Sequence, residues 1–75
     1  MILTVDQLKR IADSGGGLVL DASLFTFTQV KGIVEAAANN GSATLTLRNV
    51  ANLTAAQLIE LSAAAPGLVT FDLND

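Results

Sequence analysis

The 75-residue chain contains no cysteine, histidine, tyrosine or tryptophan. Without cysteine, neither a disulfide framework nor a thiolate metal site can add stability. Without histidine, cysteine and tyrosine, most pairings of nucleophile and general base that enzymes use are excluded. We therefore expect a protein that is not an enzyme and that holds no cofactor or metal.

Charge is also scarce. Lys and Arg number four, Asp and Glu number seven, and together they make up 15% of the chain. Binding of nucleic acid needs clustered basic side chains. The basic residues here are few and scattered: Lys9, Arg10, Lys31 and Arg48. We expect no nucleic-acid partner. A surface so poor in charge favours contact with another protein or with a second copy of the chain.

Long apolar runs are missing as well. No run approaches the roughly 20 residues that cross a bilayer, and the N-terminal MILTVDQ lacks the basic region and apolar stretch of a signal peptide. We expect a cytoplasmic protein with no membrane partner. Apolar residues nevertheless make up 51% of the chain, which predicts a packed core within one domain, residues 1–75.

A hexapeptide occurs three times in related forms: LTVDQL at 3–8, FTFTQV at 25–30 and LTAAQL at 53–58. In each form a threonine precedes a glutamine by three residues. This is the spacing of a capping box, in which the threonine hydroxyl and the glutamine side chain each accept a hydrogen bond from the other residue's backbone N–H. The apolar residues on either side have the spacing of a hydrophobic staple. The pattern predicts three helices that begin after Thr4, Thr26 and Thr54.

Apolar residues continue at helical spacing after each hexapeptide. The helices are expected to end at 14–17 (SGGG), 39–41 (NNG) and 66–67 (PG). A strand-like segment follows each end, at 18–22, 43–48 and 68–73. Within the second helix, Gly32 predicts a close packing contact, and the spacing of Lys31 and Glu35 predicts an exposed ion pair.

The alternation of apolar and polar residues gives each strand an inward and an outward face. The expected inward rows are Leu18, Leu45 and Phe71, then Leu20, Leu47 and Leu73; the outward rows are Val19, Thr46 and Asp72, then Asp21, Arg48 and Asn74. Strands that are joined through helices run parallel. The predicted fold class is α/β: three helix–strand repeats that form a short parallel sheet with helices on one face.

A short unit with an L-x-L strand and a helix resembles a leucine-rich repeat. The residues that carry the resemblance are Leu18-Val19-Leu20, Leu45-Thr46-Leu47 and Phe71-Asp72-Leu73, with Phe25 and Leu53 near the family's next apolar position. The family's buried asparagine would fall on Ser23 and Val50, so the asparagine ladder is absent. In that family the open sheet face usually binds proteins, and the resemblance implies a protein-binding module.

A second resemblance covers residues 18–65, which are similar to the core of the STAS domain of anti-sigma-factor antagonists. That domain has an L-x-L-D strand, a turn with a phosphorylatable serine, a helix and a second strand. The turn here reads TFTQ at 26–29, so only Thr26 or Thr28 could accept phosphate. The resemblance implies an alternative function as a partner-switching regulator.

Two surfaces are candidate binding sites. The open sheet face is expected to carry Val19, Asp21, Thr44, Thr46, Arg48, Thr70 and Asp72, with Arg48 between the two aspartates; it could also bind a small molecule. The edge segment comprises Leu68, Val69, Thr70, Phe71, Asp72 and Leu73, with no proline or lysine to deter strand pairing.

Repeat proteins usually have polar terminal units, and we expect neither end of this chain to have one, since it begins with Met1-Ile2-Leu3 and ends on the edge segment. The leading prediction is a non-enzymatic interaction or scaffolding module that forms a homodimer through the edge segment. The substitution Phe71→Lys is then expected to dissociate the assembly.

Overall fold

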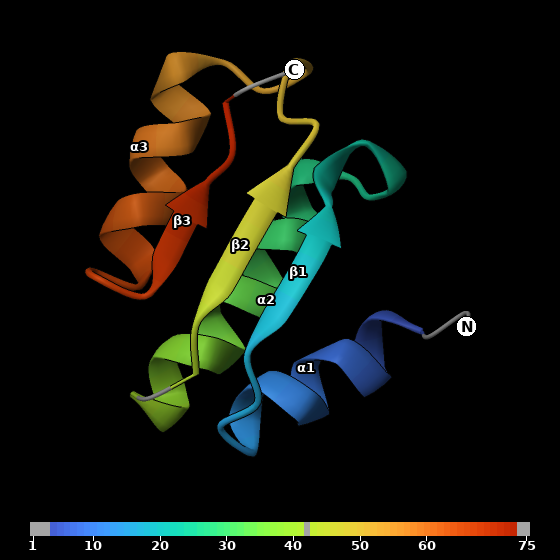
Figure 1. Cartoon of the computed structure of the whole chain (residues 1–75), viewed down its shortest axis with the longest axis vertical. Helices are drawn as coiled ribbons and strands as arrows, with labels where there is room; N and C mark the ends of the chain where they lie inside the picture. The colour runs from blue at the N-terminus through green and yellow to red at the C-terminus, as the bar shows by residue number, and fades with distance from the viewer. Residues whose placement is uncertain (1–3, 42, 74–75) are drawn as a thin grey trace.

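The computed structural model describes residues 4–41 and 43–73. The elements, in chain order, are α1 (Val5–Asp13), β1 (Leu18–Asp21), the short 3-10 helix η1 (Ala22–Leu24), α2 (Phe27–Asn40), β2 (Leu45–Arg48), α3 (Ala55–Ala64) and β3 (Val69–Phe71). The strands form one parallel sheet in the order β1-β2-β3. Helix and strand alternate three times, which confirms the predicted α/β class (Figure 1).

All three α-helices begin with the predicted capping box. The threonine hydroxyls of Thr4, Thr26 and Thr54 accept hydrogen bonds from the backbone N–H groups of Gln7, Gln29 and Gln57 at 3.2, 3.2 and 3.1 Å. The glutamine Oε1 atoms accept from the threonine N–H groups at 2.9, 2.9 and 3.0 Å. These bonds satisfy donors that a helix N-terminus leaves without intrahelical partners. The hexapeptide is therefore a helix start in every copy.

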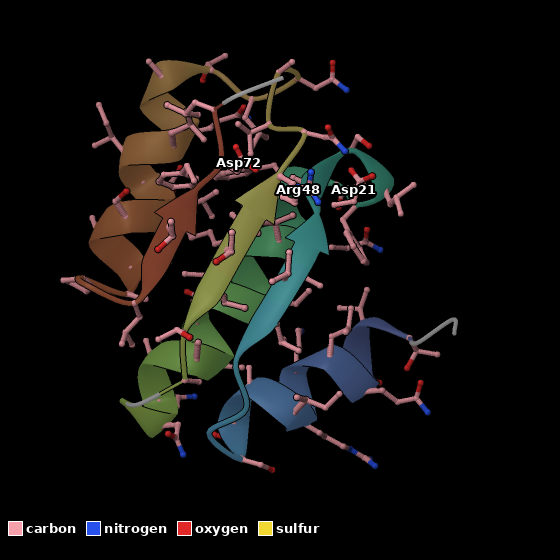
Figure 2. The ribbon with its side chains drawn as sticks, viewed as in Figure 1. Asp21, Arg48 and Asp72 are labelled. Carbon is pink, nitrogen blue, oxygen red and sulfur yellow. The ribbon has the colours of Figure 1, made fainter. Side chains whose placement is uncertain are left out.

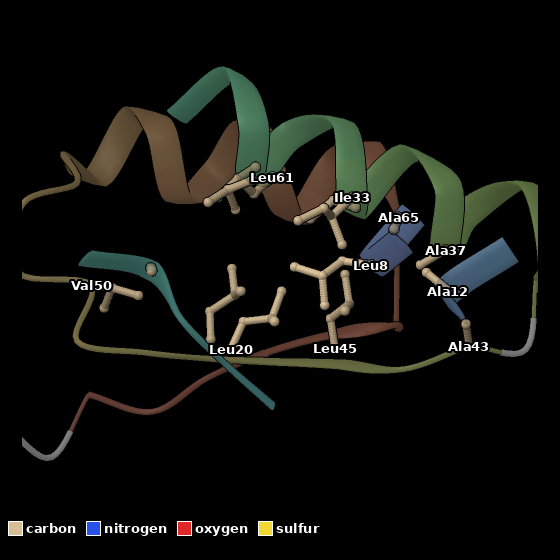
Figure 3. Close-up of a cluster of buried hydrophobic side chains, with 14 residues drawn as sticks. Leu8, Ala12, Leu20, Ile33, Ala37, Ala43, Leu45, Val50, Leu61 and Ala65 are labelled. Carbon is tan, nitrogen blue, oxygen red and sulfur yellow. The ribbon is translucent and has the colours of Figure 1, made fainter. Parts of the chain in front are cut away.

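The core lies between the sheet and the helices, which cover one of its faces (Figure 3). Its centre combines Ile33 and Val34 of α2 with Leu45 and Leu47 of β2 and Leu61 of α3, all of which are fully buried. Leu8 and Ala12 extend the same core beneath α1. No polar side chain is buried among the described residues. The opposite face of the sheet is left open, as the threonines of β2 predict.

The register of β3 differs from the prediction by two residues. Val69, not Phe71, lies opposite Leu45, and Phe71 lies opposite Leu47. A shift of two keeps every side chain on its expected face, because side chains alternate with a period of two. The alternation of apolar and polar residues therefore predicts on which face of the sheet each β3 side chain lies, but not which residue of β2 lies opposite it.

The predictions at the end of β3 change with the register. β3 ends at Phe71, and Leu73, which was expected to point inward, is 67% exposed. Asp72 was expected beside Thr46 and lies instead close to Arg48. Asn74, expected in the last outward row, falls outside the described residues.

Gly32 of the second helix lies where α2 approaches a side chain of α1. A Cβ atom added at Gly32 would lie 2.8 Å from Cε of Lys9, so the predicted close packing contact is confirmed. The predicted partner of Lys31 is wrong. The expected partner was Glu35 of the same helix, but the Nζ atom of Lys31 lies 2.8 Å from Oε1 of Glu60 on α3. The packing of α2 beside α3 offers Lys31 this partner across the helix layer.

The described part of the first helix, α1, has a polar outer surface. Its exposed residues are Asp6, Gln7, Arg10 and Asp13. Residues 1–3, on which the expectation partly depended, fall outside the described residues. Of the two terminal units, only the last exposes an apolar helix surface.

Candidate interaction site

The β3 strand forms one edge of the sheet, as the dimer prediction requires (Figure 1). The carbonyl of Leu68 accepts from the N–H of Leu45, and the N–H of Asp72 donates to the carbonyl of Leu47. In a parallel ladder alternate residues direct their backbone groups to the same neighbour. The N–H and C=O groups of Val69 and Phe71 therefore point away from β2, towards the free edge.

The side chains of the edge segment divide between the two faces of the sheet. Leu68, Val69 and Phe71 are half-buried against the core, whereas Thr70 is exposed on the open sheet face. The substitution Phe71→Lys would consequently disturb the core as well as the edge. Thr70→Lys adds charge to the same strand without removing a core contact, and it is the cleaner test of edge pairing.

The preceding helix, α3, has an apolar outer surface that the sequence analysis missed. Its exposed residues include Ala55, Ala56, Ala63 and Ile59, and the Ile59 side chain is 69% exposed. A helix turns by about 100° per residue, which places Ala56, Ile59 and Ala63 on the side opposite the buried Leu61. The signal was present in the sequence, because this helix is apolar on nearly all sides.

The few polar side chains of α3 all have partners within the chain. The Gln57 side chain completes the capping box of Thr54, and the Ser62 hydroxyl donates to the carbonyl of Leu58 at 3.0 Å. The Glu60 carboxylate accepts from Nζ of Lys31 at 2.8 Å. This hydrogen bond raises the pKa of Lys31, and the charges of Glu60 and Glu35 add to the effect. The side of α3 opposite the core is thus apolar, and the exposed Glu60 and Ser62 lie on either side of it.

A charged group lies where the parallel strands end, on the open sheet face (Figure 2). Arg48 is placed between Asp21 and Asp72, as predicted, and its Nε atom lies 3.4 Å from Oδ2 of Asp72. The side chain of Arg48 is largely exposed, so the pair is screened by solvent and contributes little to stability. The group forms a solvated cluster at the strand ends.

Asp21 has a local structural role at this cluster. Its Oδ1 atom accepts hydrogen bonds from the backbone N–H of Ser23 at 3.0 Å and from the Ser23 hydroxyl at 2.5 Å. The Ser23 side chain is the main cause of a lowered pKa for Asp21, with smaller contributions from Asn49 and from the charge of Arg48. Asp21 thereby caps η1, which turns the chain away from β1 immediately after the strand.

The other residues of the open sheet face occupy the predicted side of the sheet. Val19 is 68% exposed on β1, Thr44 and Thr70 are exposed, and Thr46 is half-buried between them. Among the described residues, no group of three or more His, Cys, Asp or Glu is placed to hold a metal ion. Away from the charged group at the strand ends, this face therefore offers threonine hydroxyl groups and the exposed Val19 side chain.

The two threonines that the STAS resemblance singles out differ in environment. Thr26 is the cap of α2, and its hydroxyl accepts the hydrogen bond from Gln29. Thr28 lies in the first turn of the same helix with an exposed side chain. Phosphate on Thr26 would compete with the cap, whereas Thr28 is accessible without loss of that bond.

Comparison of the chain with protein-family models, curated proteins and solved structures gave no match. No helix in the part of the chain that the structure describes has the length and apolar character needed to span a membrane.

Proposed function

We propose that this protein is a non-enzymatic interaction or scaffolding module that self-associates through its last helix–strand unit, residues 54–73. The observation that carries the proposal is the apolar surface of α3 beside the unpaired edge of β3. Large exposed apolar side chains and free strand edges are features that soluble proteins usually cover or blunt. A homodimer is the simplest assembly that covers them.

Charge also favours a second copy as the partner. Residues 54–73 contain two charged side chains, Glu60 and Asp72, and each has a cationic partner in the same chain, Lys31 and Arg48 respectively. Charges that lie near a two-fold axis meet the same charges of the other copy, so cationic partners within the chain lower the repulsion between two copies. The outer surface of α1, with Asp6, Arg10 and Asp13, is less suited to this contact.

The molar mass in solution tests the proposal. Sedimentation equilibrium over a series of concentrations up to the high micromolar range should show a mass that rises from that of the 7.7 kDa chain towards twice that value. A mass equal to that of one chain at every concentration would contradict the proposal. The cytoplasmic location expected from the sequence is not part of this test and stays a prediction.

A STAS-like regulatory function is the alternative, and the exposure of Thr28 at the N-terminus of α2 favours it. A phosphate group near a helix N-terminus is stabilised by the helix dipole and by free N–H groups. Incubation with an extract of the native host and ATP should then phosphorylate the wild type but not Thr28→Val. Absence of phosphate from both Thr26 and Thr28 would count against this alternative.

A further inference from the structure

The C-terminal ends of α1 and α2 lie side by side and are joined by an asparagine (Figure 1). Nδ2 of Asn40, the last residue of α2, donates a hydrogen bond to the backbone carbonyl of Asp13, the last residue of α1, at 3.0 Å. Gly41 follows directly, in the one Asn-Gly sequence of the chain. We propose that Asn40 is a site of spontaneous deamidation, that docking of α1 on α2 suppresses the reaction, and that the aspartate product weakens this docking.

The reaction requires only the chain and water. The backbone nitrogen of Gly41 attacks the side-chain carbonyl carbon of Asn40, and the bond from that carbon to Nδ2 breaks. The proton lost by the glycine nitrogen passes through solvent to the leaving nitrogen, which departs as ammonia. Water then opens the cyclic succinimide to aspartate or isoaspartate, without an oxidant or reductant. Because glycine has no Cβ atom, the attacking nitrogen is unhindered.

Both reacting groups are held in hydrogen bonds in the folded protein. The N–H of Gly41 donates to the carbonyl of Ala37 at 3.1 Å, with Gly41 in the left-handed conformation (φ 81°) that ends α2. The Asn40 amide is bound to the Asp13 carbonyl. Attack requires the glycine nitrogen to give up its acceptor and the asparagine side chain to leave α1. The docked helix therefore slows the reaction.

The position of α1 allows it to detach while the sheet stays intact. Its fully covered side chains are Leu8 and Ala12, and its main packing partner is α2. Residues 14–17, which include three glycines, join it to β1. Release of α1 leaves the three strands and the other two α-helices in place. Local openings of this kind require less free energy than global unfolding, so they provide the route by which Asn40 becomes reactive.

An aspartate at position 40 does not suit this contact. A carboxylate cannot donate a hydrogen bond, so it would face the Asp13 carbonyl as a second acceptor. The product also adds a negative charge to a chain whose net charge is −3. That charge would lie at the C-terminal ends of two helices, where the helix dipole disfavours it, and α2 has no basic residue in its last turn. Deamidation therefore loosens the helix that protects the site.

Peptide mass spectrometry of the full chain measures the reaction after incubation at mildly alkaline pH, with and without a denaturing concentration of guanidinium chloride. Asn40 should react several-fold faster in the denatured chain. Asn49, which is followed by valine, is the internal reference and should react slowly in both samples, because the valine side chain hinders the attacking nitrogen. Equal rates at Asn40 with and without denaturant, or no reaction in either, would overturn the proposal.

Two core variants test the role of α1. Leu8→Ala and Leu61→Ala each remove a buried leucine, the first from α1 and the second from α3. Under native conditions, deamidation of Asn40 should be several-fold faster in Leu8→Ala than in the wild type and close to the wild-type rate in Leu61→Ala. Equal acceleration in both variants would contradict a specific role of α1. Far-ultraviolet circular dichroism checks that each variant is folded.

The effect of the product can be measured without a cavity in the core. Asn40→Asp reproduces the aspartate product, and Asn39→Asp is the matched control, since it adds the same charge at the preceding, equally exposed position of α2. Backbone amides of α1 should exchange with deuterium several-fold faster in Asn40→Asp than in Asn39→Asp. Equal exchange in the two variants would show that the Asn40 amide does not hold α1. The proposal concerns the first two helices and does not depend on self-association.

Discussion

The first and last helices of this protein begin in the same way and present different surfaces to solvent. Both α1 and α3 start with a threonine–glutamine capping box, and both bury a leucine in the core, Leu8 and Leu61. The exposed residues of α1 are all polar, whereas most of those of α3 are alanine or isoleucine. The repeated hexapeptide therefore sets how a helix begins, while the residues between its core positions decide what the helix can contact.

The core contributions of the two helices can be compared by Leu8→Ala and Leu61→Ala. Each should lower the free energy of unfolding by about 2–5 kcal/mol, since each removes a buried side chain and leaves a cavity. Urea unfolding followed by circular dichroism measures the loss. If dimerisation stabilises α3, the loss of unfolding free energy caused by Leu61→Ala will depend on protein concentration. The loss caused by Leu8→Ala will depend less on concentration. Equal dependence would show that the two ends do not differ in this way.

Removal of a helix cap is expected to have the next largest effect on the free energy of unfolding. Thr4→Ala and Thr54→Ala each remove a hydroxyl that accepts from a helix N–H, and each should cost about 1 kcal/mol. Thr→Ser at the same positions retains the hydroxyl and should cost less. The same unfolding experiment measures both. A loss at Thr54 far smaller than at Thr4 would mean that the shared motif is not equally important in the two units.

The substitution Gly32→Ala tests how tightly α1 packs against α2. Alanine is favoured over glycine inside a helix by about 1 kcal/mol, and the new methyl group would meet only the flexible end of Lys9. We expect a gain in the free energy of unfolding of somewhat less than this amount. A clear loss of stability would indicate that Lys9 cannot move aside and that the two helices are locked more tightly than α2 and α3.

The smallest effect concerns pH and the end of β1. The pKa of Asp21 is lower in the folded protein than its ordinary value of 3.8. Its stabilising contribution is therefore present above that value and is lost as the pH falls from about 4 through the folded-state pKa. The unfolding midpoint of Asp21→Asn should fall less than that of the wild type between neutral pH and pH values below about 4.

Ser23→Ala tests the cause of this pKa. It removes the hydroxyl that donates to the Asp21 carboxylate, so its pH dependence should lie between those of the wild type and Asp21→Asn. A Ser23→Ala variant with the same acid sensitivity as the wild type would show that the hydroxyl does not stabilise the ionised form.

Several features could be predicted from the sequence because they depend on neighbours a few residues apart. The capping boxes join residues three positions apart, and the alternation within Leu45–Arg48 identified the buried face of β2 correctly. The parallel order followed from strands that alternate with helices. The position of Arg48 between Asp21 and Asp72 on the open face was also predicted, although the row of Asp72 was wrong.

Other features depend on how separate elements pack. The Lys31–Glu60 pair joins residues 29 positions apart, so a local search found Glu35 instead. The sequence shows that α3 is apolar on nearly all sides, but the packing of the helix decides which of these residues the core leaves exposed.

Hydrogen bonds and periodicities within a few residues set where the three helices begin and which face of each strand is buried, and the alternation of helices with strands makes the strands parallel. Tertiary structure alone decided the register of β3, the partner of Lys31 and the side of α3 that stays exposed. A slip of two residues, or a different ionic partner, leaves the local pattern unchanged, and only the packing of one element against another distinguishes the alternatives.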